Sequence, residues 1–427
     1  MDRASLTELS VWLTEAGLAG ESETALLDGF CRRAITAGLP IARAAIIIDT
    51  LHPVYEGRGF RWRREAAQPA ASGSAGFWEA MGWQGEADQP QTELVQYGPT
   101  SEGEAAENWR GSVFFHLIET GGSLFRVRFH AGETTDFATI AQLRDEGMSD
   151  VVVLITRFAP AGTIGEMDCV YSFWATDHPQ GFDDEQVEAL SGLMPKLALS
   201  VKCVSLARIA GTLVETYLGR DAGRRVLAGR IRRGVAETIS AVLWYSDLRG
   251  FTHITDHAPP QQIIPFLNDY AEAVISSIYE NGGDVLKLIG DGALAIFTAD
   301  TAAAACGSAL AAQAALRDRI ADLNLRRSGD DLPTTEIYLG LHVGEVFYGN
   351  IGSDERLDFT VVGPAVNEVA RIAAMCRSVE RNVLLSQSFA DAMARLERGR
   401  LVSVGRYALR GVERPQELFT LDPFATV

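Results

Sequence analysis

The sequence has few of the features that mark secreted, nucleic-acid-binding or membrane-spanning proteins. It holds five cysteines among 427 residues, an odd number without a CxxC pair, which predicts reduced thiols in a cytoplasmic protein. A formal net charge of -18 argues against nucleic acid as a partner, because a phosphate backbone needs a basic surface. The opening MDRASLTELS has no apolar run, so no signal peptide is expected. The longest apolar runs, AAIII and VVVLI, are too short to span a bilayer, so no membrane partner is expected.

Residues 1–203 show the alternation of helical and strand patterns that is typical of an α/β domain. A sheet between an opening helix and a long exit helix resembles the GAF-like sensor fold, and the resemblance implies a small-molecule ligand whose identity the sequence leaves open. We expect helices in 6–17, 21–38 and from 182 onward, strands in 42–51, 122–130, 150–159 and 169–177, and loops rich in Gly, Pro, Ser and acids at 66–76 and 84–108.

Residues 204–236 are interpreted as a helical connector. Leu206, Ile209, Leu213 and Leu218 have the spacing of one helical face, and a basic amphipathic piece follows Gly219. Two interpretations stay open from the residues alone. The helix packs on its own domain, or it pairs in parallel with a second chain as a coiled-coil-like signal transmitter.

Residues 237–427 alternate strands, helices and hairpins, which predicts an α/β domain with a palm-like layout. The strand ISAVLWYSD is followed by a helix that starts at Pro259-Pro260 and stops at Asn281-Gly282-Gly283. A strand hairpin, a second helix and a longer hairpin come next. The region closes with a strand, a helix, a strand and a final strand pair.

Two carboxylates stand out in this region. Asp247 follows an apolar strand just before Gly250, and Asp291 lies between Gly290 and Gly292 in LKLIGDGALAIF. Either motif alone is typical of a simple turn. If the two turns are neighbours, the carboxylates repel each other and raise each other's pKa, and a divalent cation would offset both the repulsion and the cost of burial. Two aspartates and a backbone carbonyl suit Mg²⁺ or Mn²⁺.

Five motifs occur here in a fixed order: SDLRGFT, LKLIGDGALAIF, GLHVGEVFYGNIGS, DFTVVGPAVNEVARI and YALRGVERPQELFTL. The order and spacing resemble the catalytic domain of class III adenylate and guanylate cyclases, over essentially all of residues 237–427. The resemblance implies a ferredoxin-like, palm-type fold. It also implies that Asp247, Asp291 and the Leu248 carbonyl bind two Mg²⁺ or Mn²⁺ ions per active site, which activate the ribose 3′-hydroxyl and hold the triphosphate.

The same resemblance assigns the substrate contacts. It implies that Asn367 and Arg371, one turn apart on a helix, orient the ribose and stabilise the transferring phosphoryl group. Lys287 and Thr360 match the two purine-selecting positions. A lysine donor fits adenine N1 and favours ATP, while the Thr360 hydroxyl donates or accepts and so leaves room for GTP. The remaining implied contacts, all to the phosphates, are Gly250, Phe251, Thr252 and Arg410.

The expected function is therefore an adenylate cyclase that makes 3′,5′-cyclic AMP and pyrophosphate from ATP under the control of the N-terminal sensor. In the resembled family each site is shared between two subunits, so the expected partner is a second copy of this chain. Two alternatives remain: a guanylate or promiscuous nucleotide cyclase, and a catalytically inactive regulator that works through dimer contacts.

Overall fold

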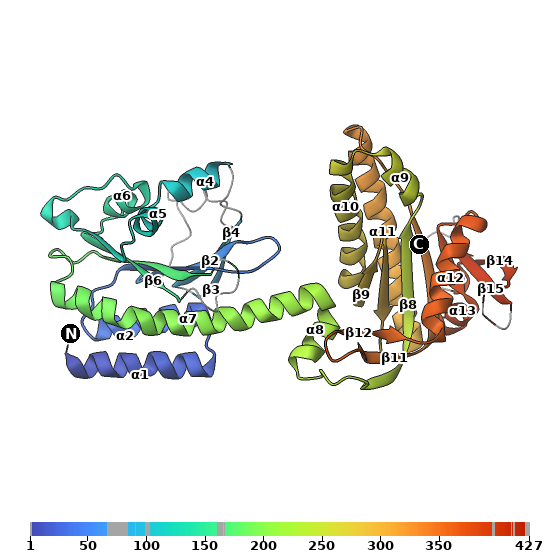
Figure 1. Ribbon diagram of the computed structural model, residues 1–427, viewed down its shortest axis with the longest axis horizontal. Helices are drawn as coiled ribbons and strands as arrows, with labels where there is room; N and C mark the ends of the chain where they lie inside the picture. Colours follow the sequence, from blue (N-terminus) through green and yellow to red (C-terminus); the bar gives the residue numbers. More distant parts are fainter. Residues whose placement is uncertain are drawn as a thin grey trace. The chain divides into compact units, whose positions relative to one another are not determined.

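The computed structural model describes residues 2–65, 84–89, 91–98, 103–159, 165, 167–394, 398–410, 412 and 415–422. The chain divides into two compact units, Met1–Leu213 and Val214–Val427. Each unit has a mixed α/β architecture, which confirms the predicted fold class (Figure 1).

Unit 1 is built on an antiparallel sheet whose described strands follow the order β3-β4-β2-β1-β7-β6-β5. The central strands β1, β6 and β7 are the apolar runs of the sequence, and they are buried on both faces. The strands are β1 (Arg43–Asp49), β2 (Gly57–Arg63), β3 (Gln84–Gln89), β4 (Thr92–Tyr97), β5 (Leu124–Val127), β6 (Asp150–Arg157) and β7 (Cys169–Thr176).

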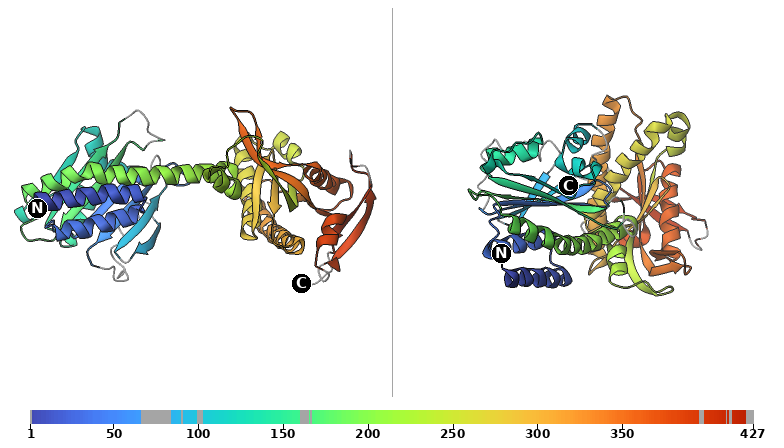
Figure 2. Two further views of the ribbon diagram at one scale, coloured as in Figure 1. Left: turned by 90° about the horizontal axis from the view of Figure 1, so that it is seen from below. Right: turned by 60° about the vertical axis from the view of Figure 1, so that its left-hand side comes forward.

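Helices cover both faces of this sheet. In the views of Figures 1 and 2, α1, α2 and α7 lie together on one face of the sheet in unit 1. The helices of unit 1 are α1 (Arg3–Ala19), α2 (Glu23–Thr36), α4 (Gly103–Arg110), α5 (Val113–Glu119), the 3₁₀ turn η1 (Phe129–Ala131), α6 (Ala138–Asp145) and α7 (Asp184–Leu218), the last of which continues beyond the unit.

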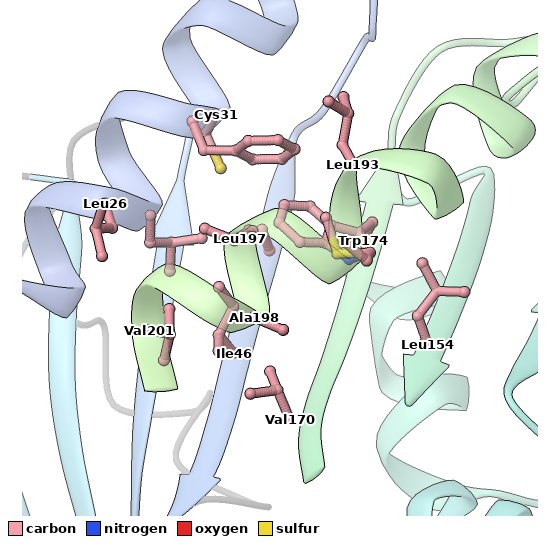
Figure 3. Packing of buried hydrophobic residues seen from close by; sticks show 14 of the residues in the cluster. Leu26, Cys31, Ile46, Leu154, Val170, Trp174, Leu193, Leu197, Ala198 and Val201 are labelled. Atoms are coloured by element: carbon pink, nitrogen blue, oxygen red, sulfur yellow. The ribbon is translucent and has the colours of Figure 1, made fainter. Parts of the chain in front are cut away.

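The larger core of unit 1 lies between the sheet and α2 and α7 (Figure 3). Leu26 of α2, Trp174 of β7 and Leu197 of α7 are each 1% exposed or less, and they pack in one cluster with Ile46 of β1. Burial of side chains of this size contributes about 1.5–3 kcal/mol each, so this cluster ties the exit helix to the sheet.

One sequence prediction for unit 1 is wrong. The range 84–108 was expected to be a loop, but its described part contains β3, β4 and the start of α4. The alternating stretch TELVQY pairs with β2 in antiparallel register, Thr92 opposite Trp62 and Tyr97 opposite Gly57. The tertiary pairing supplies hydrogen bonds that the polar composition did not suggest. The other predicted loop, 66–76, lies outside the described residues.

Helix α7 has the length and the apolar composition of a membrane span, a feature that the sequence analysis did not anticipate. A third of its most apolar part is buried inside the structure. Leu193, Leu197 and Val201 are in the core of unit 1 (Figure 3). A helix that packs in a protein core meets the same criteria of length and composition.

Unit 2 contains the sheet order β14-β15-β13-β11-β8-β10-β9, and β12 pairs with β11. Within it, β11-β8-β10-β9 is an antiparallel run in which α10 connects β8 to β9 and α11 connects β10 to β11. This is the βαββαβ ferredoxin-like arrangement that was expected. The strands are β8 (Ala236–Leu248), β9 (Gly283–Ile289), β10 (Gly292–Phe297), β11 (Ile337–Gly352), β12 (Leu357–Val362), β13 (Val383–Ser386), β14 (Leu401–Tyr407) and β15 (Gln416–Leu421).

The two faces of this sheet carry different helices. Residues of α10 and α11, which lie side by side in Figure 1, pack on the face that carries Trp244 and Leu339. Residues of α8 and α12 pack on the face that carries Leu243 and Tyr348. The helices of unit 2 are α8 (Arg220–Leu227), α9 (Phe251–His257), α10 (Pro260–Glu280), α11 (Ala302–Gly329), α12 (Pro364–Ser378) and α13 (Gln387–Ala392).

The predicted connector, 204–236, contains the end of α7, all of α8 and the first residue of β8. Leu206, Ile209 and Leu213 pack against the core of unit 1, whereas Leu218 packs in a core cluster of unit 2. The division into 1–203, 204–236 and 237–427 stays a prediction, as does the GAF-like character of unit 1.

Candidate active site

Strand β8 carries the first carboxylate of the site. Its residues alternate between the two faces of the sheet, so Trp244 faces α10 and α11 while Leu243 faces α12. Tyr245 and Asp247, two and four residues after Leu243, lie on the same face of the sheet as Leu243. Asp247 is half-buried near the end of the strand.

The second carboxylate lies in the turn between β9 and β10. Ile289 pairs with Gly292, which leaves Gly290 and Asp291 as a two-residue connection, and Gly290 has φ +64°. A Cβ on Gly292 would be 2.5 Å from the Ser246 carbonyl oxygen and 3.3 Å from Asp247 Oδ1. The glycine that follows Asp291 is therefore needed where the turn approaches β8.

The two carboxylates interact directly. The pKa of Asp247 is raised to about 6, first by burial and then by the charge and hydrogen bond of Asp291, against the lowering effect of the Leu248 N–H. The pKa of the Tyr245 phenol is also raised, by burial and by both carboxylates. The structure thus brings together two residues that are 44 positions apart in the sequence. The sequence alone does not show that they are close in space.

The donor set of this pair fits a hard divalent cation. Within the described ranges no group of three or more His, Cys, Asp or Glu side chains is placed to hold a metal. Leu248, which follows Asp247 and whose side chain is 6% exposed, could add only its backbone carbonyl to the two aspartates. Clustered anionic oxygens with open positions are what Mg²⁺ and Mn²⁺ prefer.

The residues that follow β8 turn into a short helix. Gly250 has φ +70° and precedes α9. The Phe251 ring stacks on Phe266, with centroids 6.2 Å apart and 15° between the planes, so this half-buried side chain packs against the core. The Thr252 side chain is exposed.

Lys287 and Thr360 lie on neighbouring parts of β9 and β12. Lys287 forms an ion pair with Asp358 of β12. Asp358 and Thr360 are two residues apart in one strand, so both side chains point to the same face. The ion pair therefore brings the Lys287 ammonium to the strand face that also carries Thr360.

Asp358 is a residue of this region that the sequence reasoning missed. A signal was present, because the period of two in a strand places it on the face of Thr360. The partner of its carboxylate is 71 positions away, and no local pattern shows that separation.

Helix α12 presents Asn367 and Arg371 away from its packed side. The packed side contacts β11 closely: a Cβ on Gly340 would be 2.7 Å from both the Ala373 nitrogen and the Val369 oxygen. Asn367 is exposed and Arg371 half-buried, one turn apart on the helix. Neither of these two described residues forms a hydrogen bond or ion pair with the carboxylate pair in the single chain.

Arg410 is exposed, in a turn that follows β14. The described contacts of the single chain do not connect it to Asp247 or Asp291 either. The structure therefore assembles two groups, the carboxylate pair and the Lys287–Thr360 face, and leaves Asn367, Arg371 and Arg410 separate from the first group. The roles assigned to all these residues stay predictions.

Comparison with known proteins relates the C-terminal unit to a family. Residues 235–422 match the family model described as the adenylate and guanylate cyclase catalytic domain. An uncharacterised protein of Mycobacterium tuberculosis is 33% identical over 211 residues, which are 48% of this chain and 37% of the relative. A protein of Anabaena cylindrica described as an adenylate cyclase is 34% identical over 159 residues, which are 37% of this chain and 32% of the relative.

Solved structures give a coarser likeness. The crystal structure of the adenylyl cyclase CyaB from P. aeruginosa is 23% identical, with a TM-score of 0.40, and covers 44% of this chain and 95% of that chain. This chain spans about a third of the length of the curated relatives named above. The match over residues 235–422 shows that the C-terminal unit belongs to the adenylate and guanylate cyclase catalytic domain family.

Proposed function

We propose that this chain is an adenylate cyclase that converts ATP to 3′,5′-cyclic AMP and pyrophosphate. The observation that carries the proposal is the carboxylate pair Asp247–Asp291, whose charges no described cation neutralises. The nearby cations have other partners, because Arg249 pairs with Glu336 at 2.5 Å and Lys287 pairs with Asp358. An unneutralised pair of this kind is the arrangement that a metal-dependent phosphoryl-transfer site requires.

In the proposed mechanism Asp247, Asp291 and the Leu248 carbonyl would hold two Mg²⁺ or Mn²⁺ ions. Bound ions would supply activation of the ribose 3′-hydroxyl and neutralisation of the triphosphate charge. Arg371 stabilises the negative charge that develops on the transferring phosphoryl group, because its planar guanidinium donates two parallel hydrogen bonds. Asn367 orients the ribose, and Gly250, Phe251, Thr252 and Arg410 contact the phosphates.

Lys287 is proposed to select adenine. Its ammonium has three donors, so pairing with Asp358 leaves donors free for adenine N1. Thr360 beside it accepts a hydrogen bond from the adenine amino group. Its hydroxyl is also able to donate to a 6-oxo group, so a guanylate or mixed activity is the second candidate. The matched family description covers both activities.

The separation of Asn367 and Arg371 from the carboxylate pair supports a site shared between two copies of the chain. In a C2 homodimer each copy would complete the other's site. We further propose that unit 1 is a small-molecule sensor that regulates this activity, and that the protein acts in the cytoplasm.

The test is product formation by the full chain with Mg²⁺ or Mn²⁺ and ATP, GTP, CTP or UTP offered separately. Cyclic AMP is expected as the main product, and Asp291→Ala should lower the rate at least about 100-fold, as expected for loss of a preorganised electrostatic stabiliser. Asp300→Ala is the matched control, because Asp300 is exposed and lies shortly after β10. Cyclic GMP as the main product would favour the second candidate. If neither the full chain nor residues 214–427 alone forms product from any nucleotide, the result would support the inactive regulator.

A further inference from the structure

A second cavity in unit 2 lies away from the carboxylate pair. It has a volume of about 820 Å³ and is lined by one side of α11, the start of β11, the start of β13 and the end of β15. This is the size range of small-molecule sites in proteins. The α11 residues that line it recur every three or four positions, so one helix face forms its longest wall.

Gln313 of α11 is the unusual residue of this cavity. It lines the cavity, only 8% of its surface is exposed, and it has no hydrogen-bond partner among the described residues. Asn324, which lines the same cavity, is satisfied, because its amide donates to the Thr335 carbonyl at 2.8 Å and its oxygen accepts from the Tyr270 hydroxyl. The Gln313 amide is not among the fully enclosed polar atoms without a partner, so it is accessible from the cavity, where a bound group would take the place of water as its hydrogen-bond partner.

The rest of the lining is mainly apolar around Gln313. The apolar residues include Leu310, Leu316, Ile320, Leu339, Val383 and Met393. Four charged residues also line the cavity: Arg317, which contacts Asp318 at 3.0 Å, Glu336, which pairs with Arg249, Arg400 and Asp422. The neighbours of Gln313 along α11 are mainly apolar, so the group that meets its amide should be neutral, since a buried charge without a partner is costly.

We propose that this cavity binds an uncharged, mainly apolar small molecule whose amide-like group both donates to and accepts from the Gln313 side chain. The buried position of Gln313 favours a small molecule over a docked protein segment, because a partner's surface would meet the rim first. Apolar walls with one placed polar group are the usual composition of such a site.

The cavity is also connected to the carboxylate pair through the sheet. Ile337 lines the cavity and pairs with Leu248, and the next pair in the register is Tyr338 with Asp247. A ligand that moves this part of β11 would move the end of β8. This coupling rests on the proposed function, whereas binding does not, so the two are measured separately.

The experiment uses the full chain with ¹³C-labelled isoleucine methyl groups and 2-naphthamide as the probe. Ile320 and Ile337 both line the cavity, so their methyl resonances should shift and saturate during the titration. Ala314→Leu should abolish the shifts, because its larger side chain narrows the cavity next to Gln313. Ala315→Leu, a change of the adjacent half-buried alanine that does not line the cavity, should leave them intact. Gln313→Leu keeps the size and should weaken binding about ten-fold, the loss expected for one hydrogen bond.

Unaltered binding in Ala314→Leu, or the absence of saturable shifts in the unmodified chain, would overturn the proposal. Equal affinity in Gln313→Leu would overturn the role of the amide. Shifts that depend on protein concentration without the probe would mean that a second copy of the chain occupies the cavity. Cyclase rates with saturating probe should differ at least about five-fold from rates without it, as in typical allosteric coupling. Binding of the probe without a change in the cyclase rate would show that the cavity is a binding site that is not coupled to the reaction.

Discussion

Lys287 of β9 and Asp358 of β12 form an ion pair that joins two strands outside their hydrogen-bonded pairing. Both side chains are more than 40% exposed, so the pair contributes little to stability. Its consequence is positional, because it holds the Lys287 ammonium beside Thr360.

Removal of the Asp358 carboxylate should therefore affect substrate binding more than folding. In Asp358→Asn, we expect the KM for ATP to rise by up to about five-fold, the range of an exposed ion pair, with a nearly unchanged midpoint of thermal unfolding. Asp354→Asn, which removes the exposed pair with Arg233, is the matched control. An unchanged KM would show that Lys287 is positioned without Asp358.

Mixing of two inactive variants tests the shared site. Asp291→Ala removes part of the carboxylate pair, and Arg371→Ala removes the guanidinium of α12. If each site takes these groups from different chains, a heterodimer of the two variants keeps one intact site. We expect mixtures to recover about a quarter of the unmodified rate, since half of the dimers are mixed and each has one of two sites. Heterodimers confirmed by mass spectrometry that show no recovery would contradict a shared site.

The raised pKa of Asp247 predicts how stability depends on pH without metal. A carboxyl group whose pKa in the folded state, about 6, exceeds its ordinary value of 3.8 is protonated more readily when folded. Its favourable contribution is complete below pH 3.8 and is lost as the pH rises through 6. Asp247→Asn should therefore raise the free energy of unfolding at pH 7 in EDTA by about 1 kcal/mol, after allowance for the exposure of the group.

Asp284 provides the control for this measurement. Its pKa is also raised to about 6 by burial, but its carboxylate accepts from the Asp221 N–H and is not part of the carboxylate pair. The free energy of unfolding, measured with urea from pH 4 to 8, should depend less on pH in Asp247→Asn and in Asp284→Asn than in the unmodified chain. Mg²⁺ should stabilise the Asp284→Asn variant but not the Asp247→Asn variant. Equal stabilisation of both variants by Mg²⁺ would show that Asp247 does not bind the metal.

The two ends of α8 provide a matched pair of glycines, Gly219 at its junction with α7 and Gly229 after its last turn. Gly219 and Gly229 both have φ +86°, yet a Cβ on Gly219 would lie 2.4 Å from the Val285 carbonyl oxygen, whereas one on Gly229 would have open space. Both alanine variants bear the strain of the left-handed backbone, about 1–2 kcal/mol. Gly219→Ala should lower the unfolding midpoint further, because α8 must move away from β9. Equal unfolding midpoints of the two alanine variants in calorimetry would show that α8 can shift away from β9 without loss of stability.

Much of unit 2 was predictable from local patterns. Period-two and period-3.6 apolar repeats indicated the strands and helices, and Pro259-Pro260 and Gly282 marked the limits of α10 correctly. The glycines beside Asp291 indicated a turn. These signals are local, since each depends on residues within a few positions of one another.

Other features appeared only when the chain was folded. The strand order β11-β8-β10-β9 brings Asp247 to Asp291, and the position of β12 brings Asp358 to Lys287. The unpaired amide of Gln313 is equally invisible in its amphipathic helix. In unit 2 the sequence by itself determined most of the strands, helices and turns, because those preferences are local, whereas in unit 1 it missed β3 and β4. Only the tertiary structure decided which carboxylates share a site, because that depends on strand pairing across long separations.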